Sequence, residues 1–227
     1  MVKSREFAKD LEAYENTKEL LLNRRLVPGQ RIIYRDLEER LGMSKTPILS
    51  ALVRLEQENL VVSRHNRGYY VKEWNSRDIG QIFELRAKLH EILVHHAIKN
   101  ATKENLAVLK RALDEYLAYQ SGVYDLKKFR LDIRFHIQIA KMVGNDYLTS
   151  VLDQQYSIMC CAVDVSIMTP LMKQFEQDHR LLYRAIERRD AREAKRILRS
   201  HDHAGARVFT KTNRSPRILC TKANSYR

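Results

Sequence analysis

The chain lacks the features that would place it in a membrane or outside the cell. No stretch of its 227 residues is an apolar run of about eighteen residues, so the sequence predicts no membrane-spanning helix. The first residues, MVKSREFAKDLEAYE, carry charges where a signal peptide needs an apolar core. We therefore expect a cytoplasmic protein that has no membrane partner.

Cysteine is scarce as well. The three cysteines, Cys160, Cys161 and Cys220, suit a reducing compartment. Cys160 and Cys161 are neighbours, which are poorly placed to bridge each other, and they lie in an apolar run. We expect buried free thiols there; the alternative is a metal or redox role.

Proline and glycine are almost absent between Ile79 and Gly205, where apolar residues recur with a helical period. This pattern predicts an all-α bundle of about six helices joined by short loops. The expected helices run from a Ser76 cap to about Ala101, from Lys103 to Ser121, from Leu126 to Gly144, from Leu148 to about Met168, from Thr169-Pro170 to about Arg188, and from Asp190 to Val208.

The positive charge is spread along the chain. Residues 1–75 carry 14 basic and 11 acidic side chains, residues 76–210 carry 22 and 17, and residues 211–227 carry five and none. The expected domains are a head over 1–75, a helical domain over 76–210 and a basic tail over 211–227, which has no period and is expected to be disordered. Because the head is not a strongly basic block, DNA affinity would need locally clustered cations and paired heads.

Residues 28–71 have the pattern of a winged helix-turn-helix. Leu37 and Leu41 place one apolar face on a helix over Tyr34–Leu41, which Gly42 ends in a left-handed conformation. Ser44 caps a second helix with Pro47 in its first turn, where proline is tolerated. Two short strands, 60–62 and 69–71, then flank a basic loop. The fold class is mostly α, with a small β-hairpin wing.

A recognition helix meets base edges and phosphates at its N-terminus, and a wing holds the backbone of the duplex. The residues expected at double-stranded DNA are Arg35, Ser44, Lys45, Thr46 and Pro47 in the helices, and Arg64, His65, Arg67 and Gly68 in the wing. The alternative is a winged helix that contacts proteins.

These residues resemble the GntR family of bacterial transcription regulators. The match includes Pro-Gly, DL-x3-LG, S-K-T-P, RLE and the wing glycine, over about forty residues in order. The resemblance implies a homodimer whose two heads bind a pseudo-palindromic operator. Leu49-Ser50 stands where many relatives carry Arg-Glu, and Asn59 where many have Gly. The operator sequence therefore does not carry over.

Histidine placement in the second half is the other signal. Asp132 and His136 lie at i, i+4 on an apolar helix face, and His179 and His201 lie on later helices. Brought together, one carboxylate and three imidazoles make a divalent metal site with mixed nitrogen and oxygen ligands. By spacing alone, an ion pair and satisfied core histidines remain alternatives.

The motifs D-x2-FH-x7-GN and H-x2-L-x2-AI-x2-RD-x3-A-x6-H resemble the FCD ligand-sensing domain of the FadR branch of that family, over residues 80–207. The resemblance implies a metal, zinc or nickel, held by Asp132, His136, His179 and His201. His203 points elsewhere on its helix and is not expected to be a ligand.

Four protein ligands leave one or two open positions on a five- or six-coordinate ion, and a small carboxylate can occupy them and displace water. We therefore expect the effector to be a small carboxylic acid that binds at the metal. Arg86 is the expected cation for its far end, the alternative being a solvated residue or an ion pair. His90 stands where the family usually has Glu, which removes a negative charge from the pocket wall and makes a longer or more acidic effector plausible. Arg130 and Arg134 are expected to be surface groups.

The sequence thus predicts a ligand-responsive transcription regulator and no enzyme. One alternative is a hydrolase that uses the Asp/His metal, although no motif supplies a general base. Another is a regulator whose metal only stabilises the bundle, in which case ligands would not affect DNA release.

Overall fold

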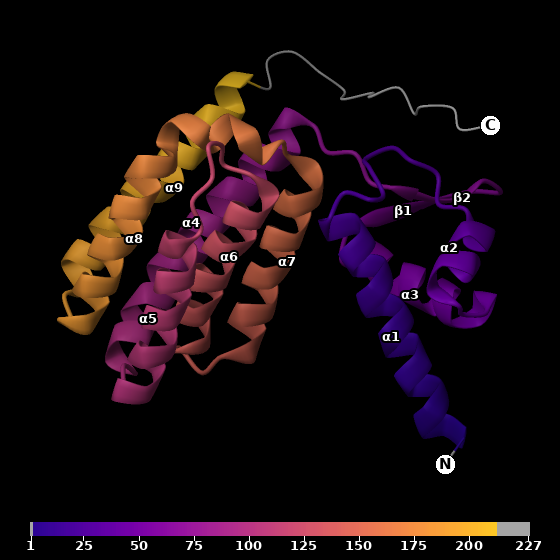
Figure 1. The fold of residues 1–227 in the computed structure, drawn as a ribbon, viewed down its shortest axis with the longest axis horizontal. Helices are drawn as coiled ribbons and strands as arrows, with labels where there is room; N and C mark the ends of the chain where they lie inside the picture. The colour runs from indigo at the N-terminus through magenta and orange to yellow at the C-terminus, as the bar shows by residue number, and fades with distance from the viewer. Residues whose placement is uncertain (1, 213–227) are drawn as a thin grey trace.

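The computed structural model describes residues 2–212, and the side chains of residues 7–209. A head with a two-stranded sheet lies beside a helical bundle, and the long N-terminal helix lies between them (Figure 1). The prediction of a disordered tail concerns residues that fall almost entirely outside this range, because the last helix extends to Thr212.

The head has the predicted winged helix-turn-helix. Helix α2 (Tyr34–Leu41) ends at Gly42, whose φ of 65° is the left-handed conformation expected of it. Helix α3 (Lys45–Gln57) follows with Ser44 at its N-cap position, although the Ser44 side chain makes no capping hydrogen bond. Strands β1 (Val61–Arg64) and β2 (Gly68–Val71) pair antiparallel with Val61 opposite Val71.

Helix α1 (Val2–Leu22) adds to the predicted elements and completes the core of the head. It packs along α3 and buries Ala13, Tyr14 and Leu21, which recur at helical spacing. The Tyr14 hydroxyl donates a 2.6 Å hydrogen bond to Glu58 at the end of α3. Because of this packing, α1 and the recognition helix are expected to move as one body.

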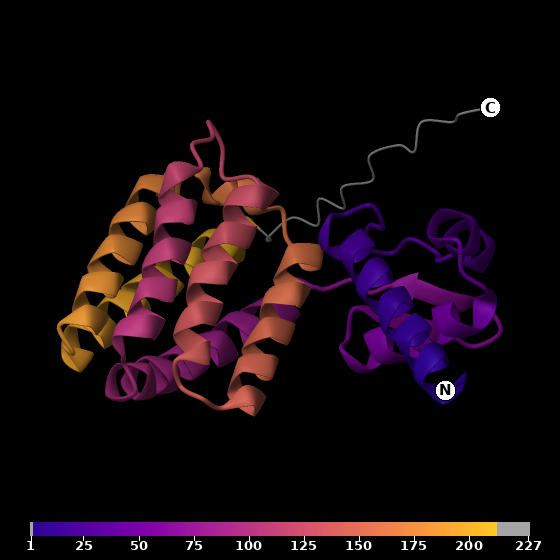
Figure 2. The same ribbon diagram turned by 60° about the horizontal axis from the view of Figure 1, so that its bottom comes forward.

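Six α-helices and one 3-10 helix form residues 76–212, which confirms the predicted bundle. They are α4 (Ser76–Lys99), α5 (Lys103–Ala118), α6 (Leu126–Lys141), α7 (Asp146–Ala162), η1 (Val165–Leu171), α8 (Met172–Glu187) and α9 (Ala191–Thr212). Helices α5, α6, α7 and α8 run side by side, and α4 crosses obliquely behind α6 and α7 (Figure 2). Helix α9 packs against α8 and α4 (Figure 1).

The start of α4 differs slightly from the prediction. Its cap is Asn75 and not Ser76: the Asn75 side chain accepts hydrogen bonds from the backbone of Arg77 and Asp78. The Asp78 carboxylate accepts in return from the Asn75 backbone N–H at 2.9 Å. This capping box satisfies donors that have no partner within a helix and fixes where the bundle begins.

The predicted helix from Leu148 to Met168 is too long. Helix α7 ends at Ala162, Val163 is extended, and Asp164 caps η1 by accepting from the Ser166 backbone N–H at 3.0 Å. Pro170 lies inside η1 and has no N–H to donate, so a continuous α-helix through it is disfavoured.

The head and the bundle share apolar contacts. Ile158 and Cys161 of α7 belong to the core of the head, and Arg24 donates from Nε to the Cys160 carbonyl at 3.1 Å. Both cysteines are buried free thiols, as predicted, and burial raises the pKa of each to about 12. Such thiols are inert at neutral pH.

Among residues 2–212, no single helix is long and apolar enough to cross a membrane. One bent pair, Asp146–Ala162 with Val165–Glu187, passes the test by length and composition only, and the two parts meet at 101°.

Candidate functional site

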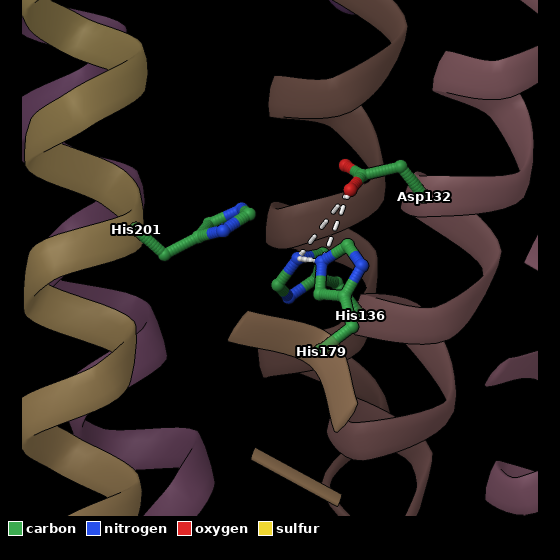
Figure 3. Close-up of side chains that lie close together, drawn as sticks. All are labelled: Asp132, His136, His179 and His201. Carbon is green, nitrogen blue, oxygen red and sulfur yellow. Dashed lines mark hydrogen bonds and ion pairs between the residues drawn. The ribbon is translucent and has the colours of Figure 1, made fainter. Parts of the chain in front are cut away.

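The four predicted ligands converge from three helices. Helix α6 supplies Asp132 and His136 one turn apart, α8 supplies His179 and α9 supplies His201 (Figure 3). One ligand atom from each lies within 4.8 Å of the others. The Asp132 Oδ1 atom is 3.1 Å from His179 Nε2 and 4.0 Å from His136 Nε2, and the two Nε2 atoms are 3.1 Å apart.

The cluster lies in the core of the bundle. None of the four residues is more than 6% exposed, and His179 is fully buried. Burial, together with the neighbouring His90, His179 and His201, holds the pKa of His136 well below its usual range. Burial also lowers the pKa of His179, against the pull of Asp132. Burial opposes ionisation of Asp132, but the neighbouring His179 and His201 lower its pKa. The site therefore favours neutral imidazoles and a carboxylate, the protonation states that bind metals.

These residues fit a divalent cation. Ligand atoms about 2.0–2.2 Å from one ion lie about 3–3.5 Å from each other. His179 Nε2 lies 3.1 Å from both Asp132 Oδ1 and His136 Nε2, within that range, while Asp132 Oδ1 and His136 Nε2 are further apart at 4.0 Å. The nearest polar atom to the buried Asp132 Oδ1 is His179 Nε2 at 3.1 Å, and this oxygen accepts no well-formed hydrogen bond among the described residues. A buried carboxylate oxygen that is poorly satisfied is costly, and a cation would satisfy it.

Two neighbouring groups contact the imidazoles of the cluster. The Asp178 carboxylate lies 3.5 Å from His201 Nδ1 without forming a hydrogen bond. The Tyr116 ring packs edge-on against His179, with the ring centres 4.6 Å apart. A carboxylate beside the second ring nitrogen is a common partner of a metal-binding histidine.

A second polar cluster borders the first. Asp202 on α9 accepts from Arg86 at 3.3 Å and from His90 Nδ1 at 2.8 Å, and both partners lie on α4. The other His90 nitrogen lies 3.1 Å from the Tyr156 hydroxyl, and the His90 ring stacks on His136 at 4.9 Å. Burial disfavours the charged carboxylate, but His90 and Arg86 lower the pKa of Asp202 to about 2.

The structure bears on two of the expectations about this cluster. Of the alternatives for Arg86, the ion pair is present and the solvated residue is not: Arg86 is 5% exposed and pairs with Asp202. His90 stands where the family usually has Glu, but Asp202 faces it from α9 and places a negative charge nearby. The sequence did not identify Asp202 as a site residue, although it directly follows His201. Its partners Arg86 and His90 lie more than a hundred positions earlier in the chain, and helical periodicity does not show which distant residues meet.

Arg130 is more than a surface group. Its guanidinium donates to the Glu19 carboxylate on α1 at 2.6 and 3.1 Å and to the side chain of Asn23, which directly follows α1, at 2.8 Å. Arg134, one turn further along α6, is exposed as expected. It pairs with Glu115 on α5, so both partners belong to the bundle. Helix α6 thus carries two of the candidate metal ligands and also a polar contact to the head.

The predicted DNA contacts on the head are mostly exposed. Ser44, Lys45 and Thr46 are exposed at the start of α3, and Lys45 lies over the Tyr34 ring at 5.3 Å. Arg35 is exposed and pairs with Glu39. Pro47 is buried, which places its ring on the core side of the helix.

The wing is a hairpin with an exposed tip. His65 and Arg67 are exposed, and Gly68 has a φ of 83°, a conformation that other residues rarely adopt. The Arg64 guanidinium stacks over Tyr70 at 4.2 Å and lies 3.8 Å from Glu73. Cations at the wing and at the start of α3 are thus free to meet phosphates.

Known proteins share this organisation. The model of "Bacterial regulatory proteins, gntR family" matches residues 9–71, and the FCD domain model matches residues 81–204. The "Uncharacterized HTH-type transcriptional regulator YdhC" of Bacillus subtilis is 24% identical over 193 residues, covering 84% of this chain and 86% of that protein. The "Nta operon transcriptional regulator" of Aminobacter aminovorans is 31% identical over 124 residues, covering 53% of this chain and 57% of that protein.

A solved structure described as "E. coli McbR/YncC" has the same fold. Its TM-score is 0.75 at 22% sequence identity, and the match covers 90% of this chain and 98% of that one. The family models together account for the head and most of the bundle. The chain belongs to the GntR family of DNA-binding transcription regulators, in the FadR-like group that carries an FCD domain, and not to a family of enzymes.

Proposed function

We propose that the bundle senses a small organic acid at a divalent metal and that this alters DNA binding by the head. The observation that carries the proposal is the buried convergence of Asp132, His136, His179 and His201, with ligand atoms within 4.8 Å. A zinc or nickel ion with four protein ligands has open positions when it is five- or six-coordinate, and a carboxylate can occupy them.

The chain's own residues would hold and orient that ion. Asp132 and the three imidazoles supply the ligand atoms, and Asp178 would keep His201 in position. Neutral imidazoles are favoured by burial, which lowers the pKa of His136 and His179. The hydrolase alternative has no support in the family matches, which are to transcription regulators.

On the head, we propose that the start of α3 enters the major groove of the operator. Ser44, Lys45 and Thr46 would meet base edges and phosphates there, because they are exposed at a helix N-terminus. Arg35 and the wing residues Arg64, His65, Arg67 and Gly68 would hold the sugar–phosphate backbone. The predicted role of Pro47 would be to start the helix, since its ring is buried.

A homodimer in the cytoplasm remains our expectation. The two-fold symmetry of a helix-turn-helix operator requires paired heads about one DNA turn apart, or a multiple of it. Sedimentation with and without operator DNA measures this: a monomer at micromolar protein in both conditions would contradict it.

We further propose that α6 links the two domains. Arg130 donates to Glu19 of α1 and to Asn23, which directly follows α1, and α1 packs on α3. Arg130 lies on the same helix as Asp132 and His136, two and six positions before them. A displacement of α6 would therefore reach the recognition helix through one packed element. This is allostery only if the effector binds two arrangements of the heads unequally.

Fluorescence anisotropy with DNA from the chain's own promoter region tests the proposed function. We expect small carboxylic acids to change DNA affinity in metal-loaded protein and to have no effect after chelation. If carboxylic acids act equally on both forms, the metal is not the sensor. If they bind the metal-loaded protein without changing DNA affinity, the metal is structural.

A further inference from the structure

The cluster of Arg86, His90, Asp202 and Tyr156 is buried beside the candidate metal site and has no part in holding the metal. From its geometry we infer that Asp202 is a specificity-determining residue, which makes the effector a small monocarboxylate and disfavours dicarboxylates. This inference rests on the proposed function, because it concerns the same effector.

Arg86 is the cation that would otherwise attract a second carboxylate. Its guanidinium already donates to Asp202 at 3.3 Å, and both side chains are no more than 6% exposed. A buried ion pair neutralises its own charges, so the positive charge of Arg86 is largely unavailable to an incoming anion. The Arg86 Nε atom has no hydrogen-bond partner among residues 7–209 and remains able to donate to an uncharged oxygen.

Both ring nitrogens of His90 already have partners. Nδ1 lies 2.8 Å from the Asp202 carboxylate and Nε2 lies 3.1 Å from the Tyr156 hydroxyl, so neither nitrogen is available to a second carboxylate of the effector. The ring also stacks on the candidate ligand His136, with the ring centres 4.9 Å apart. The polar group beside the metal ligands is therefore the Asp202 carboxylate, which is hydrogen-bonded by Arg86 and His90.

The buried charges set how much negative charge the site accepts. Asp132 and Asp202 contribute two negative charges and Arg86 one positive charge, while the adjoining pair of Lys128 and Glu176 is internally neutral. With a divalent ion bound, one positive charge remains, and a single carboxylate neutralises it. A dicarboxylate would leave an excess negative charge beside Asp202, which is costly at low dielectric.

Asp178 does not relax this limit. Its carboxylate lies 3.5 Å from His201 Nδ1, and its side chain is 15% exposed. Water therefore reaches this carboxylate and screens its charge, so it adds less to the charge balance than the more deeply buried Asp132 and Asp202.

Calorimetric titration of matched acids into the metal-loaded full-length protein tests the inference. The pairs are propionate and malonate, butyrate and succinate, and hexanoate and adipate, so that chain length and charge are varied separately. We expect the monocarboxylate to bind about tenfold or more tightly within each pair that binds. Tighter binding of the dicarboxylates by wild-type protein overturns the inference, whatever any variant does.

D202N removes the charge while keeping the shape of the side chain. We expect D202N to raise the affinity for dicarboxylates by about tenfold. The preference for the monocarboxylate within each pair should then become smaller or reverse. D153N is the matched control, since it removes the same charge from an exposed position on α7 and should keep the wild-type ratio. A D202N ratio equal to that of wild type overturns the inference.

The two proposals fail differently. If metal binds and none of the six acids does, the proposed carboxylate effector falls and the inference falls with it. If the monocarboxylate and the dicarboxylate of each pair bind equally well, the proposed carboxylate sensor is retained and the proposed role of Asp202 is wrong. Should D202N fail to fold, the wild-type pairs still decide.

Discussion

The head and the bundle place their functional side chains in opposite environments. On the head, Lys45, Arg35 and Arg67 are exposed and face water until DNA arrives. In the bundle, Asp132 and His179 are almost fully removed from water and depend on each other. The comparison teaches that single substitutions on the head should alter DNA binding and spare stability. Changes in the buried cluster should instead alter metal binding and the stability of the bundle, and spare basal DNA binding.

Removal of the metal should produce the largest difference between the two regions, because it acts on the bundle and not on the head. Chelation would leave three imidazoles and a carboxylate facing each other inside the bundle, at a cost in stability. Metal present at a hundred to a thousand times its dissociation constant stabilises by about 3–4 kcal/mol. We expect chelated protein to unfold at a lower temperature by scanning calorimetry, with basal DNA binding unchanged at 25 °C. Equal unfolding temperatures for chelated and metal-loaded protein would show that no metal stabilises the bundle.

Acid should have the next largest effect, and only on the bundle. The pKa values of His136 and His179 are lowered in the folded protein by burial, so below the unfolded value of about 6.5 the unfolded chain binds more protons. The stability of metal-free protein is therefore full above about pH 6.5 and falls as the pH decreases below it. Asp132 and Asp202 keep their contributions in this window, because their lowered pKa values matter only below about 4.

Urea unfolding of chelated protein at two pH values on either side of that window measures the effect. H203A is a suitable control, because His203 is exposed on α9 and is not among the buried imidazoles of the cluster. A metal-free protein that is more stable on the acidic side would show that the buried imidazoles are already protonated.

On the head, K45A should weaken operator binding by about 1–3 kcal/mol if Lys45 contacts a base. R67A should instead reduce the dependence of log affinity on log salt by about one unit, as expected for one phosphate contact. Neither variant should change the unfolding temperature, since both side chains are exposed. If neither changes binding to the promoter region, the proposed DNA face is wrong.

The smallest effect is expected where the two regions meet. The Arg130 pair with Glu19 is roughly half exposed, so R130A should cost less than about 1 kcal/mol of stability. We expect it to reduce the effect of carboxylic acids on DNA affinity while leaving metal content unchanged. R134A is the matched control, because Arg134 lies one turn away and pairs only within the bundle. Equal responses in the two variants would exclude Arg130 as the link.

Much of the fold follows from local pattern. The turn at Gly42 and the scarcity of proline and glycine in the bundle correctly predicted the head and the six helices. The break after Ala162 was missed because the run through the two cysteines stays apolar, and only Asp164 and Pro170 mark the interruption.

The candidate ligands were within reach of the sequence because Asp132 and His136 lie one turn apart and the family motif supplies the other two. Asp202 and the link through Arg130 were not, because each depends on partners that only tertiary packing brings near. The periodicity of apolar residues predicts which face of a helix is buried. It does not predict which residues of other helices that face contacts.

Metal analysis of protein purified without chelators, measured by mass spectrometry for wild type, H179A and H203A, tests the central claim most directly. Wild type and H203A should each contain close to one divalent ion per chain, zinc or nickel, and H179A should lose it while remaining folded and able to bind DNA. A wild-type stoichiometry near zero that incubation with zinc, nickel or manganese does not raise would contradict the metal site. Full occupancy in H179A would show that the ligands are other residues.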